Sequence, residues 1–501
     1  MAMAGGAGRQ RRKAVMRPDG AGGAPAPGLG TTLAYGFGSV AYGVKDNGFG
    51  YFLLLFYSQV IGLDARLVGL AITLCLIFDA LSDPVVGYWS DTLQSRWGRR
   101  HPFMYASALP VAASYFLLWT PPQGWSQTEL FWYLLTLALI IRTAITFYEV
   151  PSSALLPELT SDYDRRSSLM SYRYFFGWTG GNLMSVLMFV AIFPAMATAA
   201  IPNGQFNRDA YALYGLISAG LIFIAILVSA LGTHRRIAHL APPPARRRLT
   251  FGQIFREIFE TLANRSFAAL FVATIFGAIA SGLSAALTFY LSIYFWGFSS
   301  AQIGILTLGV FVSALIGAVM APIITRTLGK KRGAMIIGLI AVLGAPAPIV
   351  LRLLGLLPAP AEAGWVFWAY FAATVIDVGL IICFQTLAAA MIADLVEQSE
   401  LKTGRRSEGI LFAASSFIRK LVTGIGVSAA AFVLAFAGIE SGAAPADTPP
   451  EAIWRLGAFY VPAVLSLWLA MIAAIAFYRI DRAGHEDNVR KLAERRGSAS
   501  R

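Results

Sequence analysis

Residues 67–89 read LVGLAITLCLIFDALSDPVVGYW and are apolar enough to cross a lipid bilayer as one helix. Asp79 and Asp83 stand four residues apart in this stretch, so one helix face carries two carboxylates at membrane depth. An acid inside the membrane costs several kcal/mol unless it is paired, hydrated or functional, and two acids on adjacent turns repel each other. The stretch therefore predicts that a cation, either Na⁺ or a proton, binds to this pair.

The rest of the chain is similarly apolar. Of its 501 residues, 57% are hydrophobic and 13% are charged, and the mean hydropathy is +0.62, which excludes a soluble protein of this size. About twelve apolar segments of roughly 20 to 30 residues predict an all-α integral membrane protein. They lie near residues 31–61, 66–91, 102–120, 128–157, 167–195, 210–232, 267–296, 302–326, 334–356, 364–396, 408–438 and 453–478.

The formal net charge of +13 indicates a membrane topology. With the N-terminus placed inside, roughly 31 of the 40 Lys and Arg fall in the tails and in the loops after even-numbered segments. The few near the opposite face are Arg66, Arg208, Arg352 and Arg455. This bias predicts cytoplasmic termini, an even number of spans, and contacts between the basic loops and anionic lipid headgroups. No basic face is interleaved with aromatic residues, so nucleic acid is not an expected partner.

A basic, proline-containing loop near the middle divides the chain. GYWSDTLQSRWGRR after the second segment resembles TRTLGKKRG after the eighth, and SDYDRRSSLMSYR after the fourth resembles LKTGRRSEGI after the tenth. Such duplication predicts a transporter of two pseudo-symmetric six-helix bundles, and the bacterial style of the loops suggests a cell (inner) membrane. The expected organisation is a disordered cytoplasmic tail over 1–30, an N-terminal bundle over 31–232, a cytoplasmic loop with an amphipathic segment over 233–266, a C-terminal bundle over 267–478, and a cytoplasmic tail over 479–501.

More charged side chains lie inside the predicted helices at a similar depth. Counted from the cytoplasmic helix ends at about 1.5 Å per residue, Asp83 and Glu149 lie roughly 12 Å deep, Arg173 roughly 10 Å, and Asp79 and Lys420 roughly 17 Å. Acids and bases from several helices thus share one layer, which suggests a water-filled central cavity. The other members are Lys45 and Asp46 in the first helix, Arg142 and Thr146 on the face of the fourth that carries Glu149, and Arg419 beside Lys420 in the eleventh.

Two interpretations of this layer stay open. Na⁺ prefers oxygen ligands, and without Na⁺ one of two close carboxylates is expected to hold a proton, so either ion can neutralise the acids. Alternatively, Arg173 and Lys420 form a structural ion-pair network with them, and Arg142 is either a structural partner or a site residue. Lys45 and Asp46 either only neutralise each other or belong to the site, although neighbours in sequence are not expected to face each other on a helix. The predicted oxygen ligands are Asp79, Asp83, Glu149 and Thr146, with Asp79 and Asp83 as the main Na⁺ ligands.

Four motifs in chain order resemble the glycoside-pentoside-hexuronide:cation symporter family of the major facilitator superfamily. They are YGFGSVAYGVKD in the first helix, FDALSDPVVGYW with SRWGRRHP, FYEVPSSALLPELTSDYDRRSSLMSYR, and MIADLVEQSELKTGRRSEGILFAASSFIRK. The resemblance covers nearly the whole membrane part. It implies the major facilitator fold with twelve transmembrane helices and uptake of a sugar together with Na⁺ or H⁺, with no other cofactor.

The resemblance also implies roles for particular residues. The cation site would be Asp79, Asp83, Glu149 and Thr146, the sugar site Lys45, Asp46, Glu149 and Arg173, and the charge partner of the cation site Lys420. Apart from the resemblance, the place of Arg142 on the helix face of Glu149 makes it a second candidate charge partner. Two positions depart from the family pattern. Glu149 stands where an aspartate is expected, and its extra methylene bears on the choice between Na⁺ and H⁺. Ser153 stands where a tryptophan would stack on the sugar, so the substrate itself is open.

Three functions therefore compete. The leading one is a secondary active symporter for a glycoside or related sugar, and the second is a cation-coupled symporter for a lysolipid or other amphiphile. The third is a membrane sensor or scaffold that transports nothing. A membrane enzyme is disfavoured, because the helices contain no nucleophile-and-base pair, no cluster of metal ligands and no phosphate-binding loop.

Overall fold

The computed structural model describes residues 27–160, 162–237, 265–403 and 408–478, and within these residues every regular element is helical. Consecutive helices of this described part join into twelve rods, in agreement with the prediction from the apolar segments. The first six rods are α1 (Leu29–Phe37) with α2 (Ser39–Asn47), η1 (Gly48–Phe52), α3 (Leu53–Leu55) and η2 (Phe56–Val60); α4 (Ala65–Thr92); α5 (His101–Leu118); α6 (Gln127–Leu159); α7 (Tyr163–Leu187) with η3 (Met188–Ile192) and α8 (Phe193–Ala195); and α9 (Arg208–His234). The last six are α11 (Arg265–Tyr290) with η6 (Leu291–Phe295); α12 (Ser300–Thr327); α13 (Lys330–Gly344) with α14 (Ala347–Leu353); α15 (Trp365–Thr403); α16 (Glu408–Ala437); and α17 (Pro450–Ala476).

The helices form where long apolar runs begin at good N-terminal caps. Ser126 and Glu129 make a capping box at the start of α6, and Ser299 with Gln302 makes another at the start of α12. In the described part of the chain, nine helical stretches are long and apolar enough to cross a membrane by length and hydropathy, and the shorter apolar stretch Val422–Ala437 adds to them. This confirms the all-α membrane class.

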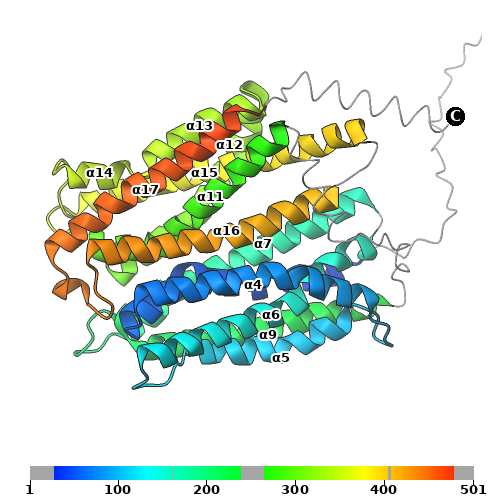
Figure 1. Cartoon of the computed structure of the whole chain (residues 1–501), viewed down its shortest axis with the longest axis horizontal. Helices are drawn as coiled ribbons and strands as arrows, with labels where there is room; N and C mark the ends of the chain where they lie inside the picture. The colour runs from blue at the N-terminus through cyan, green and yellow to red at the C-terminus, as the bar shows by residue number, and fades with distance from the viewer. Residues whose placement is uncertain (1–26, 161, 238–264, 404–407, 479–501) are drawn as a thin grey trace, which may run out of the picture.

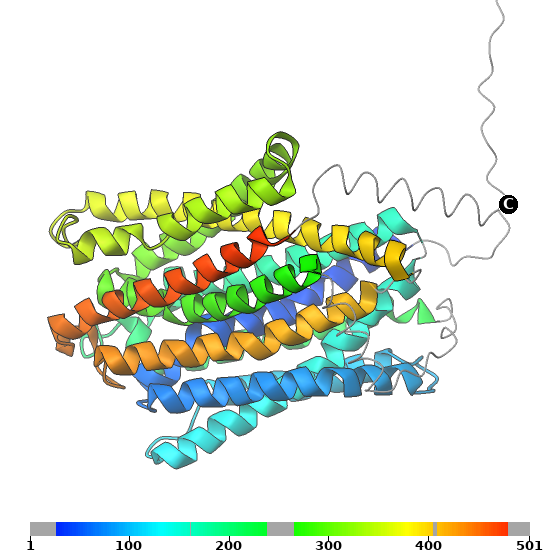
Figure 2. The same ribbon diagram turned by 45° about the horizontal axis from the view of Figure 1, so that its top comes forward.

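The rods are arranged in two bundles. In Figure 1, α4, α5, α6, α7 and α9 lie together in the lower half, and α11, α12, α13, α15 and α17 lie in the upper half. The principal contact between them is made by α4 and α16, which run side by side in Figures 1 and 2. Residues 1–26 of the predicted first tail, the predicted second tail beyond residue 478 and most of the predicted central loop, with its amphipathic segment, lie outside the described residues. The predicted first tail extends too far by two residues, since α1 begins at Leu29.

The two bundles repeat one detail of the backbone. The first rod ends in the π-helical turn η2 and the seventh ends in the π-helical turn η6, and each is followed by a glycine with positive φ, Gly62 at 85° and Gly297 at 68°. The left-handed conformation favours glycine because it has no Cβ. The hydrogen bonds also match: Ile61 N to Phe56 O (3.0 Å) and Leu63 N to Tyr57 O (2.9 Å) in one bundle, Trp296 N to Leu291 O (2.9 Å) and Phe298 N to Ser292 O (2.9 Å) in the other.

These two turns meet at what we call the distal end, the end of the bundles that carries the loops after η2 and η6. The Gln59 amide lies 3.4 Å from the hydroxyl of Tyr290 and 3.0 Å from that of Tyr294. The hydroxyls of Ser58 and Ser441 are 3.3 Å apart, and the Gly442 amide donates to the Ser58 carbonyl at 3.0 Å. We call these contacts the distal seal.

The first and fifth rods approach each other closely at Gly43. A Cβ added to Gly43 would lie 1.9 Å from the carbonyl oxygen of Gly177, and a backbone atom cannot move aside as a side chain can. We expect Gly43→Ala to destabilise the protein by about 3 kcal/mol, because overpacking a tight contact forces the helices apart. A thermal melt in detergent measures this. Gly50→Ala is the matched control, since nothing lies within 4 Å of its added Cβ; equal melting temperatures for the two variants would contradict the prediction.

Candidate functional site

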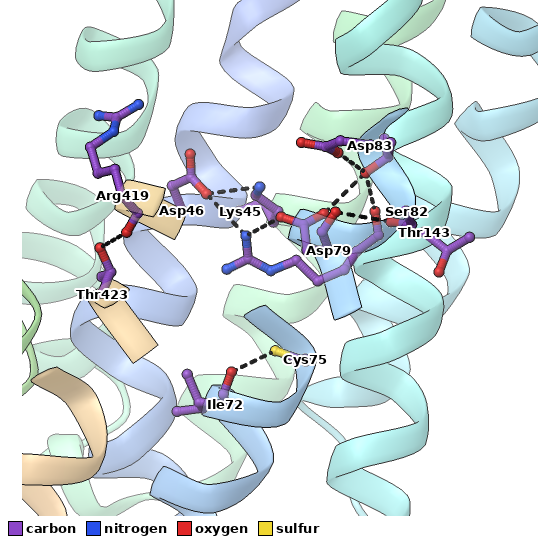
Figure 3. Close-up of polar contacts among 12 residues, drawn as sticks. Lys45, Asp46, Ile72, Cys75, Asp79, Ser82, Asp83, Thr143, Arg419 and Thr423 are labelled. Atoms are coloured by element: carbon purple, nitrogen blue, oxygen red, sulfur yellow. Dashed lines mark hydrogen bonds and ion pairs between the residues drawn. The ribbon is translucent and has the colours of Figure 1, made fainter. Parts of the chain in front are cut away.

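The fourth rod brings Thr146 to the two carboxylates of the second. The Thr146 hydroxyl lies 3.0 Å from Asp79 Oδ1 and 3.2 Å from Asp83 Oδ1, while Asp79 and Thr146 are each only 1% exposed. Figure 3 shows Asp79 and Asp83 on successive turns of α4, facing the neighbouring rods. The spacing in the sequence predicted that these oxygens share a face, and the structure brings them together.

The Thr146 hydroxyl has more acceptors around it than it has protons. Besides the two carboxylates, the Arg142 carbonyl oxygen lies 2.9 Å away. A hydroxyl carries a single proton, so it cannot donate full hydrogen bonds to three oxygens at once. The hydroxyl can therefore donate a full hydrogen bond to only one of these oxygens at a time.

Arg142 brings a positive charge to the acid layer and links three rods. Its Nη1 lies 3.4 Å from Asp79 Oδ2 and 3.9 Å from Asp46 Oδ1, and its guanidinium stacks 4.8 Å from the Phe49 ring centroid. The side chain is 6% exposed. The guanidinium touches the acid layer directly, a contact that both interpretations of Arg142, structural partner and site residue, share.

Lys45 and Asp46 form an ion pair, with 2.8 Å between Lys45 Nζ and Asp46 Oδ1. The expectation that they would not face each other was wrong. A lysine side chain is long and flexible enough to fold back along the helix, and here it is buried to 3% exposure while Asp46 stays 54% exposed. Asp46 Oδ1 also lies 3.9 Å from Arg142 Nη1, so the pair continues the charged row that begins at Asp83.

Arg173 is held by neutral groups of the first and fourth rods. Its guanidinium donates to the Tyr35 hydroxyl at 2.8 Å and to Ser153 Oγ at 2.9 Å, and it lies 5.8 Å from the centroid of the Tyr42 ring. Tyr35 in turn donates to the Ser152 carbonyl at 2.8 Å. The interpretation of Arg173 as an ion-pair partner of Asp79 and Asp83 is not supported, since its recorded polar partners carry no charge.

Two predicted site residues are not drawn into these contacts. Glu149 is half-buried one turn beyond Thr146, and its carboxylate makes no recorded hydrogen bond or ion pair among the described residues. The residues searched there hold no group of three or more His, Cys, Asp or Glu side chains suited to a metal ion, and Glu149 is recorded as an electrostatic neighbour of Arg142. Lys420 belongs to α16, but its side chain lies outside the described residues; Arg419 beside it is exposed.

Sequence reasoning noted Ser153 only as the loss of a tryptophan, and it passed over Tyr35 and Asp377. Tyr35 and Ser153 hold Arg173, and the signal was present in Ser153, whose replacement of an expected tryptophan leaves a hydroxyl within reach of a guanidinium. Asp377 is a third, an acid within the tenth rod. A single acid hardly lowers the hydropathy of a long apolar segment, so only inspection of every charge in every span would have found it.

Comparison with known proteins identifies the family. Residues 34–482 match the family described as MFS/sugar transport protein. An uncharacterized symporter of Synechocystis is 26% identical, over 93% of this chain and 96% of the relative. The isoprimeverose transporter of Lactiplantibacillus pentosus is 25% identical, over 86% and 84%, and an inner membrane symporter of Escherichia coli is 23% identical, over 88% and 90%.

Solved structures agree on the fold. The crystal structure of a D-xylose-proton symporter superimposes with a TM-score of 0.57 at 15% identity, over 88% of this chain and 97% of that one. The crystal structure of the nucleoside transporter NupG gives 0.55 at 13% identity, over 89% and 98%. Both likenesses support the major facilitator architecture of two helical bundles. The chain is a multi-pass inner membrane transporter and not an enzyme, and it belongs to the MFS/sugar transport protein family.

Proposed function

We propose that this protein takes up a glycoside or related sugar together with a cation, Na⁺ or H⁺, by alternating access. The observation that carries the proposal is the Thr146 hydroxyl, which has one proton and three oxygen acceptors at 2.9 to 3.2 Å. Hard cations take such oxygens as ligands, so the same group can coordinate a cation. Relatives named as an isoprimeverose transporter, a lactose permease and a putative glycoside/cation symporter favour a sugar over an amphiphile as the cargo.

The cation site consists of Asp79, Asp83 and the Thr146 hydroxyl. Hard cations take oxygen ligands, and two carboxylates with a hydroxyl supply both charge and ligands for Na⁺, whereas a proton needs only one carboxylate. Glu149 lies one turn beyond Thr146 on α6, and it joins the cation site when a substrate or cation draws the rods together. Lys420 is assigned to the same layer as a charge partner from the second bundle.

The sugar site consists of Lys45, Asp46, Arg173 and Glu149. Charged groups form hydrogen bonds to hydroxyls that are stronger than those between neutral groups, which suits a polyhydroxylated ligand. Asp46, at 54% exposure, is the most accessible acid of the row and is positioned to receive sugar hydroxyls.

Arg142 connects the two sites. Because it lies between Asp79 and Asp46, a cation that binds beside Asp79 repels the guanidinium and shifts it toward Asp46. Asp46 then shares its charge between Arg142 and Lys45, so the sugar-side pair is rearranged whenever the cation site is filled. Coupling follows as a difference in sugar affinity between the two states of the cation site.

The positive-inside bias places both termini in the cytoplasm, so that the distal end faces the outside. Every hydrogen bond recorded between the two bundles in the described residues lies in their distal half, and the deepest is made by Thr73 Oγ1 with the Gly424 carbonyl and Ser428, at 2.7 Å each. Asp79 and Asp83 follow on the inner side of Thr73 along α4. This conformation is therefore assigned to the inward-facing half of the transport cycle.

A thermal-shift screen of the purified protein tests the function. Sugars and lysolipids are added with and without Na⁺ and at several pH values, because a ligand that binds the folded state raises the melting temperature. The proposal expects stabilisation by a sugar that grows when Na⁺ or acid pH is combined with it. Stabilisation by lysolipids alone would show that the cargo is an amphiphile. If no ligand's effect depended on the cation, the proposed coupling would be wrong.

Ser153→Ala is expected to weaken sugar binding. The change removes the oxygen that accepts from Arg173 at 2.9 Å, so the guanidinium is oriented by Tyr35 alone. Loss of a hydrogen bond to a charged group costs about 1.5 to 3 kcal/mol, so the sugar half-saturation concentration should rise roughly 10- to 100-fold at saturating cation. Ser152→Ala is the control, since it keeps the carbonyl that Tyr35 binds. A changed cation dependence with unchanged sugar half-saturation would count against the assignment.

A further inference from the structure

Asp377 is an acid in the interior of the tenth rod. It follows Trp365, the start of α15, by twelve residues, which places it about 18 Å from that helix end and near the middle of the membrane. Its Oδ1 is fully buried and has no hydrogen-bond partner among the described residues. No lysine, arginine or histidine of the described chain is recorded in an ion pair with it.

The ninth rod is broken at the level of Asp377. α13 ends at Gly344 and α14 begins at Ala347, and the sequence across the break is GAPAP. Proline has no backbone N–H, so Pro346 and Pro348 cannot donate to the carbonyls four residues earlier, which belong to Val342 and Gly344. The break therefore leaves carbonyl oxygens without their helical donors in a region that has little water.

Asp377 faces this break. A Cβ added to Gly344 would lie 3.3 Å from Asp377 Oδ1, a contact closer than most real Cβ atoms make, and Gly344 leaves that space free. A carboxyl group with a proton is a donor, and the freed carbonyls are acceptors. The acid and the break thus complement each other chemically only when the acid is protonated.

The surroundings offer no positive charge that would favour the ionised form. The titratable groups recorded as interacting with Asp377 are Tyr370 on its own helix and Tyr460 on α17, and both are neutral phenols. The Tyr460 hydroxyl is 3.4 Å from Ser284 Oγ on α11. The rods α11, α12 and α13, which pack against α15, add no recorded charged group there in the described residues. An ionised carboxylate at this depth would be costly, since no counter-ion from the described residues reaches it.

We propose that Asp377 is a proton-binding site, separate from the carboxylates of the second rod. When it is protonated, its hydroxyl donates a hydrogen bond to a backbone carbonyl freed at the break between α13 and α14. Binding of the proton joins the ninth and tenth rods, and its loss leaves a carboxylate facing carbonyl oxygens and pushes the two apart. The site lies wholly within the second bundle, so it does not depend on which cation accompanies the sugar. It makes the second bundle sensitive to protons even if the first uses Na⁺.

Infrared spectroscopy of the purified full-length protein tests this site, with the proton itself as the probe. At neutral pH the difference spectrum, wild type minus Asp377→Asn, should contain the C=O stretching band of one protonated carboxylic acid, while any band from Asp79 and Asp83 is common to both proteins and cancels. The control is Glu362→Gln, which removes an exposed acid of the loop before α15 and should keep the band. A spectrum of Asp377→Asn that is identical to the wild type in this region would overturn the proposal.

A second measurement keeps Asp377 in place. The double change Pro346→Ala with Pro348→Ala returns N–H donors to the ninth rod, so the Val342 and Gly344 carbonyls become engaged within the helix. The Asp377 hydroxyl then loses its acceptor, and its C=O band should move to higher frequency and disappear at a lower pH than in the wild type. An unmoved band with an unchanged titration would show that the break does not hold the proton.

Discussion

Replacing Asp79 or Asp83 by asparagine is expected to abolish cation-stimulated sugar uptake while the protein still folds. Each change removes one negative charge from a cluster in which Thr146 contacts both carboxylates. Asp79→Asn also leaves the buried Arg142 without its 3.4 Å partner. Removing one member of a buried charge pair costs about 3 to 5 kcal/mol of folding stability, so a thermal melt must first show that the variant is folded. In the folded variant, loss of a charged ligand of the cation should lower the stimulated rate roughly 100-fold or more, which corresponds to about 3 kcal/mol of lost cation binding. Thr146→Ala removes a neutral ligand and should cost less, roughly tenfold.

Initial rates of uptake into proteoliposomes at stepped Na⁺ concentration and stepped pH measure this effect. Asp64→Asn is the matched control, because Asp64 precedes the same helix, is half-exposed, and caps it through an oxygen that asparagine also has. Its uptake should equal that of the wild type. If both Asp79→Asn and Asp83→Asn retained wild-type rates and ion dependence, the cation site would have to lie elsewhere.

A disulfide across the distal seal is expected to stop transport. The Ser58 and Ser441 hydroxyls are 3.3 Å apart on opposite bundles, so cysteines at both positions are within reach of each other. Once they are oxidised, the distal end cannot open, and alternating access requires that it open in every cycle. Uptake in the double variant should fall to background under oxidant and return when a reductant is added.

The single variants Ser58→Cys and Ser441→Cys control for the substitutions themselves and should respond to neither reagent. The natural cysteines Cys75 and Cys383 are buried inside separate rods and remain in all the variants compared. Full transport by the cross-linked double variant would show that the distal end does not open during the cycle, and the inward-facing assignment would be lost with it.

Regular spacing made much of the site predictable. Helix geometry alone puts Asp79 and Asp83, four residues apart, on one face, and likewise Thr146 and Glu149, three apart. The basic loops after every second apolar segment predicted an even number of rods. The pattern on a single helix does not predict which rods contact each other. The Arg142 contact with Asp46 and Asp79 joins three rods, so it became visible only when they were packed.

Side-chain reach and backbone irregularity explain the remaining misses. Helix geometry separates Lys45 from Asp46, but a four-carbon side chain bends back across that separation. The relation between Asp377 and the break at Gly344 spans 33 residues and depends on two prolines whose effect is to remove donors. Patterns of apolar residues record what a helix buries and are insensitive to hydrogen bonds that are missing from its backbone.

The distal seal also bears on how strongly the protein appears to bind from each side of the membrane. Its interbundle hydrogen bonds, such as those of Gln59, Tyr294 and Ser58, contribute about 1 kcal/mol each, so three of them favour the closed distal end by roughly a hundredfold. Only about one protein molecule in a hundred has its distal end open to a sugar from outside, so the apparent dissociation constant measured from that side is about a hundredfold higher. The same sugar presented from within meets no such penalty, so measurements on right-side-out and inside-out vesicles should report two affinities for one binding site.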